Sequence, residues 1–189
     1  MAEPGHREPA PEPLRRVQQF INSIDIEEGR DQLADPAGLA AWLAEHGLDA
    51  GVKQLNAADL RAVVLLRDAL RELAAANNGL AADAAKAAVT INHAAARSRL
   101  VPVLGDDGDT HLKPAAGGLS GALGAILADV HKGIANGTWR RLKACERGHC
   151  RWVFYDASRN RSGRWCSMAV CGSREKSRRA YHRSRTTDD

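Results

Sequence analysis

All four cysteines of this 189-residue chain lie in one short C-terminal segment, and this is the strongest constraint on its fold. They occur as two pairs, Cys145 with Cys150 and Cys166 with Cys171, and four residues separate the members of each pair. Such paired cysteines predict a tetrahedral metal site, because Zn2+ binds thiolates strongly and four of them complete its coordination. We therefore expect one structural zinc ion on these four residues, with no open position for water or a substrate.

Two other interpretations of the cysteines stay open. The four residues could be unrelated reduced thiols, which is disfavoured because no cysteine occurs outside the two pairs. His149 could also replace Cys150 as a ligand, although only its adjacent position favours this. A segment of this size has almost no core of its own, so we expect zinc to supply most of its folding free energy, on the order of 10 kcal/mol or more.

The net charge of +4 is the sum of two opposite parts. Residues 139–189 contain 14 Lys and Arg against 5 Asp and Glu, a net of +9, which leaves −5 for residues 1–138. Three of the four tryptophans also lie in the basic part. This asymmetry favours contact between the basic part and a nucleic acid or another anionic surface.

Two basic stretches lie beside the second cysteine pair. Residues 158–164 have the composition of a flexible loop, and residues 173–185 predict a helix that Ser173 can cap, with Glu175 as its one acidic residue. Phosphate binding explains these stretches better than a solvated face, which normally mixes both signs. Arg174 or Arg178 is expected to read base edges, because a guanidinium group matches guanine. The predicted nucleic-acid contacts are Arg159, Arg161, Arg164, Arg174, Lys176, Arg178, Arg179 and Arg183.

An aromatic run lies between the cysteine pairs, at residues 151–156. In a strand it places Trp152 and Phe154 on one side and Val153 and Tyr155 on the other. We expect one pair to pack around the metal site or against the rest of the chain, in preference to forming a platform for stacked bases.

The part before the cysteines predicts a mainly α-helical domain with a small β-hairpin. Residues 1–13 contain four prolines and no packing pattern, so we expect a disordered leader. Apolar periodicity and capping residues predict five helices, and residues 25–34 are expected to form a loop. The predicted helices begin near residue 14, after Asp35, after Asn56, near residue 80 and after Gly118, and the predicted hairpin spans residues 100–112. The predicted organisation is a leader (1–13), a helical domain (14–138), a small treble-clef or ribbon-like zinc module with four cysteine ligands and a C-terminal basic helix (139–185), and a tail (186–189).

Several classes of protein are disfavoured. The sequence has no apolar run of about 18 residues, so we expect no membrane span, and the N-terminal residues lack the apolar centre of a signal peptide. No metalloprotease, nucleophile-elbow or P-loop motif occurs, so we expect a protein that is not an enzyme. Gly118, Gly121 and Gly124 are better explained by close helix packing than by a phosphate loop, and Trp42 is expected in the core.

The C-terminal motif resembles the bacterial CGNR zinc-finger family from Cys145 through Arg183, with Trp165-Cys166-Ser167-Met168 as a distinctive match. Residues 20–23 and 35–43 resemble the helical ABATE domain that precedes this finger and is linked to stress-induced transcription regulation. The resemblance implies zinc on the four cysteines, DNA binding and a bacterial cytoplasm, with nucleoid association when bound. One departure is Ser173, where the family has Asn; we expect the fold to survive, because Ser is also a capping residue.

The leading hypothesis is a zinc-dependent, DNA-binding transcription regulator whose helical domain senses a ligand or mediates dimerisation. Its expected partners are double-stranded DNA, a second copy of the chain and an unidentified small molecule in the helical domain. One alternative is an RNA-binding zinc protein in which Trp152, Tyr155 or Trp165 stacks on bases. The other is a zinc-stabilised interaction module whose basic helix meets an acidic protein.

Overall fold

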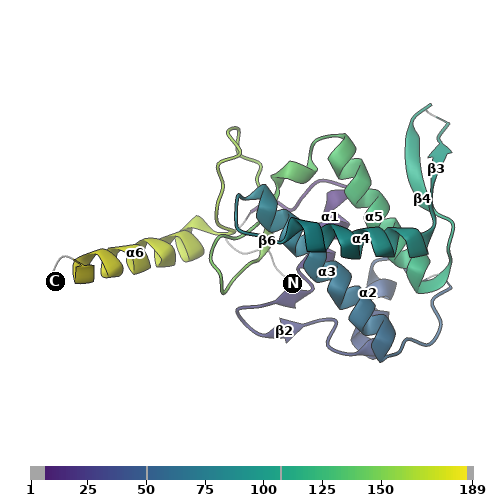
Figure 1. Cartoon of the computed structure of the whole chain (residues 1–189), viewed down its shortest axis with the longest axis horizontal. Helices are drawn as coiled ribbons and strands as arrows, with labels where there is room; N and C mark the ends of the chain where they lie inside the picture. Colours follow the sequence, from purple (N-terminus) through teal and green to yellow (C-terminus); the bar gives the residue numbers. More distant parts are fainter. Residues whose placement is uncertain (1–6, 50, 107, 187–189) are drawn as a thin grey trace.

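The computed structural model describes residues 7–49, 51–106 and 108–186, and only the backbone of residues 179–180 and 182–186. Its body is a bundle of helices with small antiparallel hairpins, and a last helix extends away from one end of this body (Figure 1). The mainly helical fold class with a C-terminal cysteine module is therefore confirmed.

The helices lie close to where apolar periodicity predicted them. Among the described residues, no helix is long and apolar enough to cross a membrane. The α-helices are α1 (Leu14–Ile21), α2 (Pro36–Glu45), α3 (Ala57–Asn77), α4 (Ala84–Ser98), α5 (Gly118–Ala135) and α6 (Ser173–Thr186), and two short turns are η2 (Trp139–Arg141) and the π-helical η3 (Met168–Gly172).

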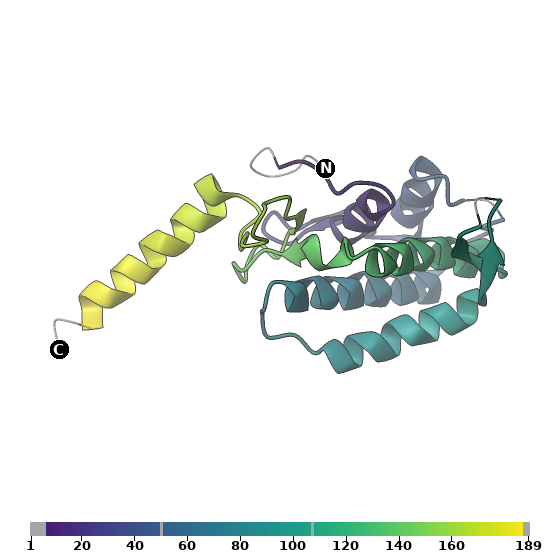
Figure 2. The same ribbon diagram turned by 90° about the horizontal axis from the view of Figure 1, so that it is seen from above.

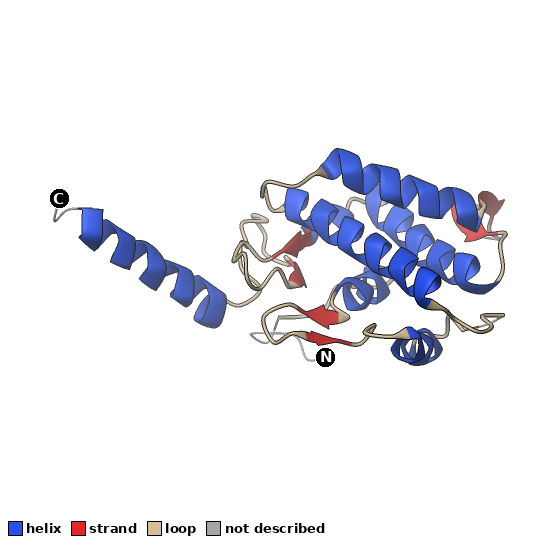
Figure 3. Ribbon diagram, turned by 60° about the horizontal axis from the view of Figure 1, so that its bottom comes forward, coloured by secondary structure: helices blue, strands red, loops and turns tan. Residues whose placement is uncertain are grey.

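Within the described ranges, the strands form three two-stranded antiparallel hairpins. The predicted hairpin is β3 (Leu100–Leu104) paired with β4 (Thr110–Pro114). The other two hairpins pair β1 (Ile24–Asp25) with β2 (Arg30–Asp31), and β5 (Leu142–Ala144) with β6 (Val153–Tyr155). Figure 3 shows the strands in red.

The core of the body forms where α3, α4 and α5 lie alongside one another and α1 packs on α3 and α5 (Figure 2). Trp42 is in this core as expected, with its ring 5.4 Å from that of Phe20. A Cβ on Gly124 would lie 2.7 Å from the Cβ of Ser98, and one on Gly133 would lie 2.6 Å from Leu14. The packing role expected of Gly124 is thus confirmed, since any larger residue would separate the helices.

The β1–β2 hairpin replaces the loop expected over residues 25–34. Buried Arg67 of α3 holds it, because its guanidinium group donates to Asp31 at 2.7 Å and to the Ser23 hydroxyl at 3.3 Å. Two-residue strands of mostly polar side chains have no apolar alternation, so the sequence pattern does not show them.

The expected disordered leader is partly ordered. Ala10 is buried and its N–H donates to Gln18 at 2.7 Å. Arg7 donates to the carbonyl oxygens of Trp165 and Cys166, and its guanidinium carbon lies 4.4 Å from the centre of the Phe154 ring. Residues 7–13 therefore pack against the chain through contacts that are distant in sequence, and residues 1–6 lie outside the described residues.

The β5–β6 hairpin is fastened to the helical body by side-chain amides. Asn22, which follows α1, donates to the Val153 carbonyl at 2.7 Å and accepts from the Val153 N–H at 2.9 Å, as a neighbouring strand would. Asn77 donates to the carbonyls of Trp139 and Leu142, and Asn78 donates to those of Ala144 and Arg164. The cysteine module and the body therefore share hydrogen bonds and a core.

We predict that Asn22→Ala lowers the free energy of unfolding by about 2 kcal/mol, because it removes the acceptor of the buried Val153 N–H and the shorter of the two hydrogen bonds to the Val153 carbonyl. Urea unfolding measures this change. Asn92→Ala, on an exposed position of α4, is the control and should change stability by less than about 0.5 kcal/mol. Equal effects of the two substitutions would contradict the proposed anchoring by Asn22.

Candidate functional site

The four cysteines come together as one buried cluster, and none forms a disulfide. Their sulfur atoms all lie within 4.8 Å of one another, and the distances from Cys166 Sγ to Cys150 Sγ and to Cys171 Sγ are both 3.6 Å. A tetrahedral site with Zn–S bonds of about 2.3 Å places its sulfurs about 3.8 Å apart. The cluster therefore fits one structural zinc ion.

The close approach of the sulfurs explains why the cluster needs a cation. Hydrogen bonds from Cys150 and Cys166 lower the pKa of Cys145. Hydrogen bonding to the Cys145 sulfur raises the pKa of both Cys150 and Cys166. Ionisation of one cysteine is favoured here, and its negative charge disfavours ionisation of the neighbouring cysteines. A divalent cation is therefore required for four thiolates to exist together.

Two different turns present the cysteines. In the first, between β5 and β6, the Arg147 carbonyl accepts from the N–H groups of Cys150 and Arg151, at 2.9 and 3.1 Å. In the second, the side chain of Ser167 accepts from the Val170 N–H at 3.2 Å and begins η3. The step of five residues from Cys166 to Cys171 matches the i to i+5 spacing of a π-helical turn.

Ser173 does not cap the C-terminal helix, contrary to our expectation. The helical segment already begins with η3, and Ser167 caps it. The Ser173 hydroxyl instead donates to the Met168 carbonyl at 3.3 Å. The helix starts earlier than predicted because the second cysteine turn is itself helical.

The aromatic run of β6 divides between two cores, as strand alternation predicted. Trp152 and Phe154 are buried with the cysteines. Val153 is buried in the core of the helical body, and Tyr155 packs against that core. Trp152 and Phe154 thus form the small core of the cysteine module.

The basic loop expected over residues 158–164 is built on a buried ion pair. Lys143 Nζ donates to Asp156 at 2.8 Å and to the carbonyls of Arg161 and Gly163, while Asp156 also accepts from the N–H groups of Ser158 and Gly163. Burial opposes the charge of Asp156, but the hydrogen bonds from Lys143, Ser158 and Gly163 lower its pKa to about 2. The loop therefore has a defined shape in spite of its composition.

The predicted nucleic-acid contacts lie on the loop and on α6, beside the cysteine cluster. Arg159, Arg161 and Lys176 are exposed. Arg164 pairs with Glu146, Arg174 with Glu27 and Arg178 with Glu175, at N–O distances of 2.5 to 2.7 Å. The side chains of Arg179 and Arg183 lie outside the described residues.

Sequence reasoning missed two further arginines and their carboxylate partners. Arg147, in the first cysteine turn, pairs with Glu27 at 2.7 Å, and Arg151 pairs with Glu72 of α3 at 2.8 Å. These partners are more than 70 residues away in sequence, so no local pattern could indicate them.

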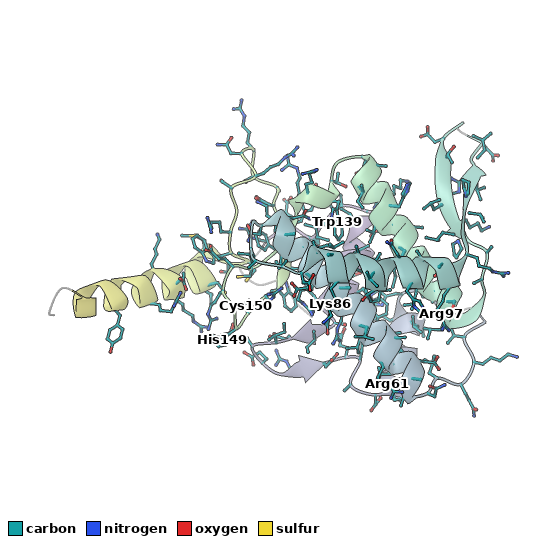
Figure 4. The ribbon with its side chains drawn as sticks, in the orientation of Figure 1. Arg61, Lys86, Arg97, Trp139, His149 and Cys150 are labelled. Carbon is teal, nitrogen blue, oxygen red and sulfur yellow. The ribbon has the colours of Figure 1, made fainter. Side chains whose placement is uncertain are left out.

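His149 is exposed and is not part of the four-residue cluster, whereas Cys150 is buried in it. Figure 4 places both residues at the end of the body from which α6 extends, and Arg61 and Arg97 far from that end, on α3 and α4. The geometry thus favours Cys150 over His149 as the ligand.

Comparison with known families agrees with this geometry. Residues 14–133 match the ABATE model, described as "Putative stress-induced transcription regulator". The chain belongs to the ABATE family. Residues 141–184 match the CGNR zinc finger, which confirms the resemblance of the C-terminal motif and its order along the chain. No curated protein matches the chain.

We predict that zinc removal by a chelator unfolds the finger around the cysteines but not the helical body of the ABATE domain. Hydrogen exchange should increase at residues 145–151 and 157–172, since metal binding supplies their folding free energy. Exchange at α3 and α5 should change little, because their core does not include the cysteines. A purified protein that contains no zinc, and whose exchange is unchanged by chelator, would contradict the assignment.

We predict that Asp156→Asn lowers the free energy of unfolding by about 3 kcal/mol, because it leaves Lys143 charged and buried without its counter-ion. The lowered pKa of Asp156 also fixes the sign of the acid response: its stabilisation is complete above about pH 4 and is lost as the pH falls towards 2. Urea unfolding of both proteins measures the two effects. Equal stability of wild type and variant at pH 7 would show that the ion pair is not important for the loop.

Proposed function

We propose that this protein is a zinc-dependent regulator that binds double-stranded DNA through the basic surface of its finger. The main support is the position of the exposed cations Arg159, Arg161 and Lys176, on a loop that leads into Cys166 and on a helix that follows Cys171. A zinc-held turn and a buried ion pair fix these elements, so their charges have a defined spacing. Such an arrangement suits the regular phosphates of a duplex.

Helix α6 is the element proposed to enter the major groove. It extends from the body in Figures 1 and 2, and its first turns contact η3 and Glu27. The major groove of B-DNA is wide enough to admit an α-helix. Arg174 and Arg178 lie on one face, and in the proposal they exchange their carboxylate partners for phosphates or for the edges of guanine bases.

The aromatic residues favour duplex DNA over single-stranded RNA. Of the three aromatic residues considered for stacking on RNA bases, Trp152 is only 5% exposed and Tyr155 and Trp165 are half-buried, so none of them is fully open to a base. The recognition surface therefore consists mainly of cations, which is the usual composition for contacts with a phosphate backbone.

The helical domain is proposed to be the sensing part. A cavity of about 440 Å³ lies between α3, α4 and α5, with Leu66 and Leu123 in its wall and His93 and Arg97 among its polar residues. A small organic anion with an apolar body would suit this lining. In this proposal the protein acts in the cytoplasm on chromosomal DNA, and a dimer would contact two half-sites.

We predict that the zinc-loaded protein binds a labelled duplex and that log affinity falls with log salt concentration by about 0.9 for each phosphate contact. A variant with Arg159, Arg161, Arg174 and Arg178 all changed to alanine should retain zinc and lose most of this affinity. Fluorescence anisotropy between about 50 and 200 mM salt measures both effects.

The control for this experiment changes Arg61 of α3 and the exposed Lys113 of β4 to alanine, because Arg61 lies far from the finger in Figure 4 and β4 lies at the end of the body opposite to α6 in Figure 1. Its affinity should stay close to that of wild type. A salt slope near zero would refute the electrostatic mechanism. Tighter binding of single-stranded RNA, or an acidic protein partner that survives nuclease treatment, would instead support the alternative functions.

A further inference from the structure

A polar cleft lies between the first cysteine turn and the start of α6. Its volume is about 520 Å³, and its lining combines the basic side chains of Arg147, His149, Arg174 and Arg178 with the carboxylates of Glu146 and Glu175. These two carboxylates are paired with Arg164 and Arg178. Arg147 and His149 are not among the nucleic-acid contacts that the sequence predicted. At one edge of the cleft, the guanidinium groups of Arg147 and Arg174 converge on a single anion.

That anion is the carboxylate of Glu27, which belongs to the ABATE domain. Arg147 Nη1 donates to both carboxylate oxygens at 2.7 Å, and Arg174 Nη1 donates to one of them at 2.5 Å. The hydrogen bond from Arg147 is the largest influence on Glu27 and lowers its pKa, so the carboxylate is charged at neutral pH. Two guanidinium groups around one pair of anionic oxygens are also a common way of binding phosphate.

The ABATE fold sets the position of Glu27. This residue lies in the turn between β1 and β2, where the Glu28 N–H donates to Asp25 at 3.0 Å. The hairpin is held on α3 by the ion pair between Arg67 and Asp31. Glu27 is thus presented to the finger by an element of the helical body.

The contact is exposed enough for an incoming anion to replace it. The side chain of Glu27 is 30% exposed and that of Arg174 is 54% exposed. Ion pairs at such positions contribute little free energy, because solvent screens them. A backbone phosphate shares one negative charge between two oxygens, as a carboxylate does, but it belongs to a polyanion whose neighbouring phosphates contact other cations of the finger. It therefore competes favourably with the single carboxylate of Glu27.

We propose that this cleft binds a backbone phosphate of the DNA and that Glu27 occupies the phosphate position in the free protein. This inference rests on the proposed function. Displacing Glu27 would couple the β1–β2 hairpin to the DNA affinity of the finger. By reciprocity, any state of the ABATE domain that holds the hairpin against the finger weakens DNA binding.

The test compares the full-length, zinc-loaded wild type with Glu27→Gln and Glu28→Gln, using a labelled duplex and fluorescence anisotropy. Both substitutions remove one negative charge from the same turn, but Glu28 contacts only Arg30 among the ion pairs described for it, at 3.9 Å. We expect Glu27→Gln to bind the duplex about fivefold more tightly than wild type, because the internal competitor is weakened. Glu28→Gln should differ from wild type by less than about twofold.

Arg147→Gln supplies the second arm of the test. It should weaken duplex binding, and in the Glu27→Gln/Arg147→Gln double variant most of the gain from Glu27→Gln should disappear, since both residues act at the same phosphate. Zinc content and a thermal melt check that each variant is folded.

The outcomes separate the two proposals. If wild type binds the duplex but Glu27→Gln and Glu28→Gln have equal affinities, the competition is refuted and the proposed function stands. If neither wild type nor any variant binds the duplex, the proposed function is wrong and this inference fails with it. Hydrogen exchange gives an independent readout: saturating DNA should increase exchange in residues 24–31 of wild type, and increased protection there would overturn the displacement of Glu27.

Discussion

The short β5–β6 hairpin is the constraint on which the rest of the molecule depends, because both of its faces are buried in different cores. Val153 packs into the helical body, while Trp152 and Phe154 pack around the cysteines. At the edge of the hairpin, the side-chain amide of Asn22 forms hydrogen bonds with the Val153 N–H and carbonyl, which a neighbouring strand would otherwise do. The zinc centre and the helical bundle are therefore parts of one packed structure, and neither can move far without breaking buried hydrogen bonds.

This rigid connection decides how the basic charge is presented. Lys143, on β5, holds the loop that carries Arg159 and Arg161, and the cysteine turns hold the start of α6. The ABATE domain contributes directly to the finger through Glu27, and Arg7, which precedes that domain, covers the Phe154 ring. In the proposed function, coupling between the helical body and the finger needs no long-range relay, because the two parts are in direct ionic contact.

Much of the fold was predictable from local patterns. Asp35 and Asn56 begin helices because their side chains satisfy the first free N–H groups, and the structure shows both caps. The two cysteine pairs indicated a zinc site because the ligand chemistry is specific. The β1–β2 hairpin, the order of residues 7–13 and the buried positions of Arg67 and Lys143 were not predictable, since each depends on partners distant in sequence.

The sequence by itself determined the metal centre, the helices and the location of the positive charge, because cysteine spacing, apolar periodicity and composition are local properties. The tertiary structure alone decided which charges pair between elements that are distant in sequence. Glu27 lies 120 residues before Arg147 and 147 before Arg174, yet all three meet at one point because α3 supports the hairpin and the cysteine turns support the arginines. Pairing between charges follows from the packing of whole elements, and only the folded chain brings those elements together.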